Sequence, residues 1–124
     1  MIRLGSFVAG LALVAASIGV VWGDERDQLC RPGYATSVRP SLEVSQRLKL
    51  ALCSQHHIAD CHHGWILDHI IPLELGGDPV AASNLQLQTF ASAHAKDLVE
   101  NETRREYCAG KITLQEAQGR FHRD

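Results

Sequence analysis

The alternation of apolar and polar positions separates an apolar first segment from a mixed remainder. Residues 4–22 run for nineteen positions without a charge, after Arg3 and before the charged residues 24–27. A positive start, an apolar run and small residues at its end are typical of a secretory signal peptide. We therefore expect residues 1–23 to be a signal peptide that is cleaved after Gly23. An uncleaved membrane anchor is the alternative, because about 20 apolar residues span a bilayer.

The remaining residues carry helical and strand patterns in turn. Leucines recur near helical spacing after Ser41, a suitable N-cap, whereas the sequence up to Pro40 indicates that residues 24–40 are irregular. β-branched and aromatic residues precede Pro72, and polar and apolar residues alternate at 84–88, so both segments are predicted strands. The predicted elements are a helix over 41–53, a strand over 64–71, a strand over 84–88, a helix over 91–108 and a short helix over 113–121.

This order predicts a small α+β fold, and a length of 124 residues sets a ceiling of one domain. We expect an N-terminal extension with one helix over residues 24–63 and the functional domain over residues 64–124. Without Arg3, the exported part has eleven Lys and Arg against fourteen Asp and Glu, a net charge of −3. This charge argues against a protein that coats polyanions with its whole surface, but it is compatible with a local basic strip.

All four cysteines lie in the exported part of the chain, where an even count predicts two disulfides with three alternative connectivities. Cys53 and Cys61 enclose a short polar loop, which favours the pairs Cys53–Cys61 and Cys30–Cys108. The alternative is a zinc site, because histidines at 56, 57, 62 and 63 surround two of the cysteines. The spacing matches no standard zinc finger, and export favours the disulfides.

Two adjacent polar residues, Asp68 and His69, interrupt the apolar strand shortly before Pro72. Metal-assisted hydrolysis of a phosphodiester needs an oxygen ligand for a divalent cation and a neutral imidazole that removes a proton from water. Neighbouring strand residues point to opposite faces, so both side chains serve one site only if the backbone bends there. Taken alone, the pair is better explained as a hydrogen-bonded strand end, and the surrounding residues decide between the two interpretations.

The sequence LDHIIPLELGG at 67–77 is followed by Asn84-Leu85 and then by a predicted helix that carries His94. This joint pattern resembles the HNH endonuclease family of His-Me finger nucleases over residues 65 to about 108. More loosely, the segments CRPGYA and CAGKITLQEAQ are similar to those of small exported bacterial proteins with an HNH-type centre. The resemblance implies a ββα-metal core with flanking helices. Other members carry two CxxC pairs for a structural zinc, which this sequence lacks, so disulfides would supply that stiffness.

The resemblance also implies roles for individual residues of the motif. His69 matches the general base that activates the attacking water, and Asp68 matches the metal ligand that precedes it. Asn84 matches the central asparagine, which organises the loop by hydrogen bonds and helps to orient the histidine. These three residues are therefore the expected core of the catalytic site.

The second metal ligand is expected on the helix after the strands, and three of its residues are candidates. His94 is preferred because its distance from His69 and Asn84 is close to the family's usual spacing. Asp97 and Asn101 are the alternatives, since they can share a helix face with His94. A mixed oxygen and nitrogen site favours Mg²⁺ or Mn²⁺ as cofactor, with Zn²⁺ or Ni²⁺ as the alternatives.

The expected substrate is nucleic acid, DNA first and RNA second, cut with little sequence specificity because no separate reading head is recognisable. Lys96, Arg104 and Arg105 lie on or near the ligand helix and are expected to neutralise phosphates, although solvated surface charges explain each one equally well. The expected location is the periplasm or the cell exterior. A catalytically inactive envelope module with a binding or structural role is the second hypothesis, and a thiol-redox or zinc-storage protein is the third. After signal cleavage no stable membrane association is expected, and the sequence is silent on a possible inhibitor protein.

Overall fold

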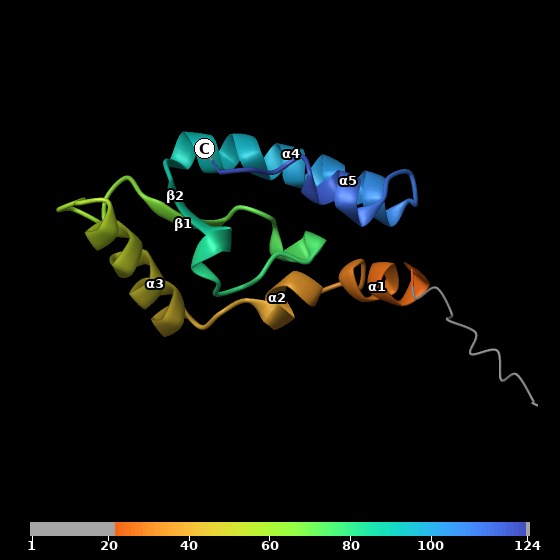
Figure 1. Cartoon of the computed structure of the whole chain (residues 1–124), viewed down its shortest axis with the longest axis horizontal. Coiled ribbons are helices and arrows are strands. Elements are labelled where there is room, and N and C mark those ends of the chain that lie inside the picture. Colours follow the sequence, from red (N-terminus) through yellow and green to blue (C-terminus); the bar gives the residue numbers. More distant parts are fainter. Residues whose placement is uncertain (1–21, 124) are drawn as a thin grey trace, which may run out of the picture.

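The computed structural model of the protein describes residues 22–123 (Figure 1). The expected signal peptide lies outside these residues, except for its last two positions. Two short strands lie in the middle of the arrangement, with α4 on one side, α2 on the other and α3 at one end (Figure 1). Within the described part of the chain, no helix is long and apolar enough to cross a membrane.

Three helices precede the sheet: α1 (Trp22–Leu29), α2 (Tyr34–Val38) and α3 (Leu42–Gln55). For α3 the prediction is confirmed, including the cap, because the Ser41 hydroxyl accepts a hydrogen bond from the backbone N–H of Val44. The prediction that residues 24–40 are irregular was wrong, since most of them are helical in α1 and α2. Such short helices have little stability alone and depend on tertiary contacts that a local pattern does not reveal.

One such contact is made by Arg26 of α1. Its guanidinium donates to the backbone oxygen of Tyr107 at 3.0 Å and to that of Ile112 at 3.3 Å. It also lies over the Tyr107 ring, 4.8 Å from the centroid. Leu29 of the same helix is buried in the core, so α1 is held at both its polar and its apolar face.

The sheet has two antiparallel strands, β1 (Ile66–His69) and β2 (Leu85–Gln88), in which Asp68 pairs with Gln86 and His69 with Leu85. Two 3-10 turns, η1 (Leu73–Leu75) and η2 (Ala82–Asn84), form most of the connection between the strands. The long helix α4 (Phe90–Cys108) and the short helix α5 (Leu114–Gln118) follow. The predicted α+β class and the order of these later elements are confirmed.

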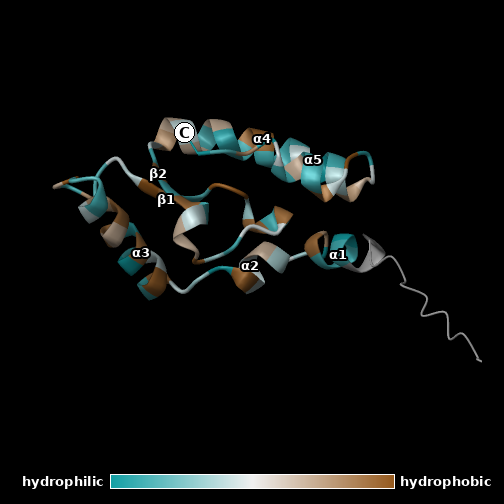
Figure 2. Ribbon diagram, in the orientation of Figure 1, coloured by the Kyte–Doolittle hydropathy of each residue, from teal (hydrophilic) through white to brown (hydrophobic). Residues whose placement is uncertain are grey.

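The hydrophobic core joins the two ends of the described chain. Leu29, Leu75, Tyr107, Ala117 and Phe121 pack together, and hydrophobic residues otherwise alternate with hydrophilic ones around each helix (Figure 2). The core is small, and large hydrophobic side chains of α3 and α4 remain exposed. Trp65 and Leu67 of the strand segment are only half-buried, and both line surface cavities.

Both predicted disulfides are present. Cys30–Cys108 ties the end of α1 to the end of α4 with Cα atoms 5.7 Å apart, and Cys53–Cys61 closes the loop after α3 with a Cα distance of 5.8 Å. Two disulfides are compatible with an oxidising compartment. All four cysteines are therefore bonded, and none remains as a free thiol to serve as a zinc ligand.

Candidate active site

The end of β1 forms one wall of a cavity of about 270 Å³ that faces α4. Asp68 and His69, the last two residues of the strand, both line it, and Asp97 and Glu100 line it from α4. Regular strand geometry would direct neighbours to opposite faces, and the strand ends here, which lets both residues border one space. The cavity therefore places an imidazole and several carboxylates together.

The imidazole of His69 is fixed by the loop between the strands. Its Nε2 lies 2.9 Å from the backbone oxygen of Pro79, which can only accept a hydrogen bond. In the neutral ring this contact assigns the proton to Nε2 and leaves the lone pair on Nδ1. Among residues 22–123, Nδ1 has no hydrogen-bond partner, so the neutral ring offers a free basic nitrogen.

Asn84 holds together the loop that carries Pro79. This buried side chain accepts from the backbone N–H of Ile71 at 2.8 Å and donates to the backbone oxygens of Ile71 at 3.1 Å and Asp78 at 2.9 Å. Buried amides satisfied in this way rigidify the backbone around them. Asn84 thus fixes the residue beside Pro79, and Pro79 in turn fixes His69.

The carboxylate of Asp78 closes the next turn of the same loop. It accepts hydrogen bonds from the backbone N–H groups of Val80 at 2.9 Å and Ala81 at 2.7 Å. These two bonds stabilise the ionised form and lower the pKa of the Asp78 carboxyl below its ordinary value. Hydrogen bonds within the turn therefore stabilise the conformation that presents the Pro79 carbonyl to His69.

Gly77 is required where the loop passes close to the strand end. A Cβ at this position would lie 1.8 Å from the Ile71 backbone oxygen and 2.8 Å from Nδ2 of Asn84. We expect Gly77→Ala to lower the free energy of unfolding by about 2 to 3 kcal/mol, because backbone must move to relieve the overlap. Urea denaturation measures this loss.

Gly33→Ala is the matched control for this substitution. Gly33 has φ 80° with nothing within 4 Å of the added carbon, so only the left-handed backbone penalty of about 1 kcal/mol applies. Equal losses in the two variants would contradict the close approach of Gly77 to Ile71 and Asn84.

Lys96 of α4 enters the site from the helix side. Its Nζ lies 3.0 Å from Oδ2 of Asp68, 2.6 Å from Oε1 of Glu100 and 2.6 Å from the backbone oxygen of His69. Gln86 donates to the same Asp68 oxygen at 3.3 Å. The Asp68 carboxylate is thus neutralised by an internal ammonium that is only 12% exposed.

Two further carboxylates, Glu74 and Glu100, border the cavity and were missed by sequence reasoning. Burial raises the pKa of Glu74, and the nearby Glu100 carboxylate raises it further. Burial also raises the pKa of Glu100, although Lys96 opposes this shift. The four-residue spacing of Lys96 and Glu100 on a predicted helix was the available signal for this pair.

Of the remaining predicted site residues, one lines this cavity and the others do not. All three candidate ligands of α4 are exposed, and Asp97 lines the cavity whereas His94 and Asn101 do not. Arg104 pairs with Glu74 at 3.6 Å, and the exposed Arg105 pairs with Glu102 on its own helix. The proposed second ligand and phosphate contacts therefore stay predictions.

The donor chemistry around Asp68 fits a hard cation. No group of three or more His, Cys, Asp or Glu side chains that could hold a metal is found among the described residues. Three oxygens nevertheless converge there, from Asp68, Glu100 and the His69 backbone, and they already surround the positive charge of Lys96. Oxygen donors of this kind suit Mg²⁺ or Mn²⁺.

Comparisons of the chain with protein-family models, curated proteins and solved structures give no match.

Proposed function

We propose that the protein is an exported, metal-dependent endonuclease of the HNH type, which hydrolyses phosphodiester bonds in DNA with low sequence specificity. In this proposal β1, β2 and α4 form the ββα-metal core. The observation that carries it is the shared cavity of Asp68, His69 and Asp97, because it unites a base and carboxylate ligands at a strand end that faces a helix. The two disulfides are compatible with the proposed export.

His69 is the proposed general base. Its Nδ1 accepts a proton from water as the water oxygen bonds to phosphorus and the bond to the leaving sugar oxygen breaks. The hydrogen bond from Nε2 to the Pro79 oxygen holds the ring in the required tautomer. Asn84 acts as a positioning residue, because it fixes the loop that supplies this oxygen.

Asp68 would hold a divalent metal ion, Mg²⁺ or Mn²⁺, together with a donor of α4. Asp97 and Glu100 border the same cavity, and His94 is the further candidate from the sequence. A metal ion bound there supplies stabilisation of the negative charge that develops on the phosphate and the leaving oxygen.

Cleavage of DNA by the purified, oxidised protein should require a divalent cation. We expect nicking of supercoiled plasmid in Mg²⁺ or Mn²⁺, complete loss of cleavage with excess EDTA, and recovery when Mg²⁺ is added beyond the chelator. The reason is that the metal ion would stabilise the negative charge that develops on the phosphate and the leaving oxygen. Gel electrophoresis measures the products, and labelled RNA tests the second substrate. Undiminished cleavage in EDTA would contradict the metal dependence.

The alternative is a catalytically inactive module that retains this fold. The observation that favours it is the ion pair between Lys96 and Asp68, since it occupies the proposed metal ligand. Intact DNA and RNA with each divalent cation would support the module and contradict the nuclease.

A further inference from the structure

The ammonium of Lys96 lies in a cage of three oxygens. The cage consists of Oδ2 of Asp68, the backbone oxygen of His69 and Oε1 of Glu100, all within 3.0 Å of Nζ. The ring of Phe121 adds a further contact, with its centroid 5.4 Å from Nζ. Lysine ordinarily keeps its ammonium in water, so a lysine held by four groups at 12% exposure is an internal cation.

The surroundings of this cage are acidic. Glu74 and Asp97 line the same cavity as Asp68 and Glu100. Arg39 also lines it, and Arg104 pairs with Glu74 at 3.6 Å, but Lys96 is the cation that contacts Asp68 and Glu100. Loss of the ammonium would leave the cage with uncompensated negative charge. Such a group of oxygens attracts a divalent cation.

A divalent cation and the ammonium cannot share the cage. A metal bound to Asp68 would lie about 2.0 to 2.6 Å from the carboxylate oxygen. This oxygen already accepts hydrogen bonds from Nζ at 3.0 Å and from Gln86 at 3.3 Å. Two positive charges at such a separation repel strongly in a partly buried site. Binding of one therefore requires departure of the other.

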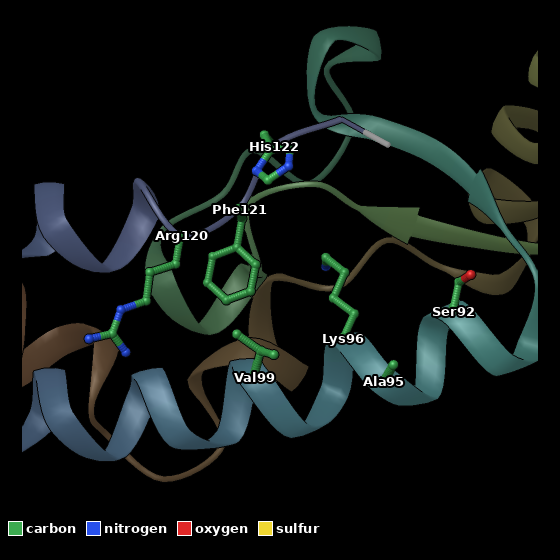
Figure 3. A pocket seen from close by; sticks show the side chains of 7 residues that line it. All are labelled: Ser92, Ala95, Lys96, Val99, Arg120, Phe121 and His122. Atoms are coloured by element: carbon green, nitrogen blue, oxygen red, sulfur yellow. The ribbon is translucent and has the colours of Figure 1, made fainter.

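The Lys96 side chain also borders a second cavity, which could hold its ammonium outside the cage. A neighbouring cavity of about 320 Å³ is lined by Lys96 itself, by Ser92 of α4 and by the C-terminal segment at 120–122. Figure 3 shows Lys96 rising from α4 beside Phe121, with Ser92 to one side along the helix. The lysine side chain has rotatable bonds enough to leave the cage for this space.

We propose that Lys96 is a displaceable internal cation, which fills the oxygen cage in the absence of metal and competes with the divalent ion for it. This inference rests on the proposed function, because it concerns the same Asp68 site. Lys96 thereby sets the metal affinity: it stabilises the metal-free protein and weakens binding of the divalent ion.

Mn²⁺ titration of the purified, oxidised protein without nucleic acid tests the competition. We expect Lys96→Met, which keeps the side-chain length without the charge, to bind Mn²⁺ about tenfold more tightly than the unmodified protein in isothermal titration calorimetry. Lys111→Met is the matched control, because Lys111 is an exposed lysine that does not line the cavity, and it should leave the Mn²⁺ affinity unchanged. Equal or weaker binding in Lys96→Met would overturn the proposal.

Lys96→Gln covers the case in which Lys96→Met does not fold. The amide still donates a hydrogen bond to the cage, so it compensates the carboxylates in part without carrying a charge. Mn²⁺ should then raise the midpoint of thermal unfolding more in Lys96→Gln than in the unmodified protein, because a ligand stabilises the folded state according to its affinity. An equal or smaller rise would overturn the proposal.

The two proposals fail separately in these experiments. Tight Mn²⁺ binding by Lys96→Met in a protein that cleaves neither DNA nor RNA would refute the nuclease and support the competition. Metal-dependent cleavage by the unmodified protein, with unchanged Mn²⁺ affinity in Lys96→Met, would support the nuclease and refute the competition.

Discussion

Replacement of His69 by alanine should reduce the rate of DNA cleavage by about a thousandfold, while the affinity for DNA stays nearly unchanged. A positioned general base contributes roughly 10² to 10⁴ to the rate. His69 lines the cavity, and the contact of its Nε2 with the Pro79 oxygen leaves Nδ1 as the basic nitrogen. The substitution also removes the hydrogen bond to the Pro79 oxygen, a loss of about 1 kcal/mol of stability that a folded domain tolerates. The expected defect is therefore in the chemical step.

Single-turnover cleavage of a labelled DNA duplex at saturating protein isolates that step, and fluorescence anisotropy with a metal that does not support cleavage measures binding. His62→Ala is the matched control, since His62 is an exposed histidine that does not line the cavity, and it should cleave at the unmodified rate. Circular dichroism checks that both variants are folded. If the cleavage rate of His69→Ala fell by less than about tenfold, His69 could not be the general base.

The elements that bear the site could be predicted because their signals are local. The strand before Pro72, the alternating segment at 84–88 and the caps at Ser41 and Thr113 each depend on residues a few positions apart. The Thr113 hydroxyl accepts from the backbone N–H of Glu116 and so caps the short helix predicted over 113–121. A short polar loop between Cys53 and Cys61 likewise limited the disulfide connectivity without knowledge of the fold.

The orientation of α4 about its own axis could not be predicted in the same way. Spacing placed His94, Asp97 and Asn101 on one face, but spacing does not say which face meets the strands. That choice is made by the buried residues Thr103 and Tyr107, which anchor the helix against the rest of the protein.

Thr103 lies four residues before Tyr107 on α4, Glu100 lies three residues before Thr103, and Lys96 lies four residues before Glu100. Residues at these spacings share one face of a helix. The inward stripe of the helix is therefore half polar, and a search for apolar periodicity does not detect it. This is the physical reason why Glu100 was missed and why Lys96, expected to contact substrate phosphates, lies against Asp68.

The Cys30–Cys108 disulfide should contribute more to stability than any other covalent feature of the described chain. It joins residues 78 positions apart, whereas Cys53–Cys61 joins residues only 8 apart. In the loop-entropy model, removal of the long link lowers the free energy of unfolding by about 4 kcal/mol, and removal of the short link by about 2 to 3 kcal/mol. A small domain with a total stability of about 5 to 15 kcal/mol would be left marginal by the first loss.

Two double variants compare the stability lost with each disulfide: Cys30→Ala/Cys108→Ala and Cys53→Ala/Cys61→Ala. They are matched, because each removes two sulfurs and leaves no free thiol. Urea denaturation at fixed pH gives both free energies of unfolding. The long link also joins α1 to the end of the helix that carries Lys96 and Asp97, so its loss should weaken Mn²⁺ binding as well as stability. A larger loss of stability from the Cys53 and Cys61 pair would show that chain entropy does not govern these two disulfides, and that local packing around Cys53, which is more deeply buried, does.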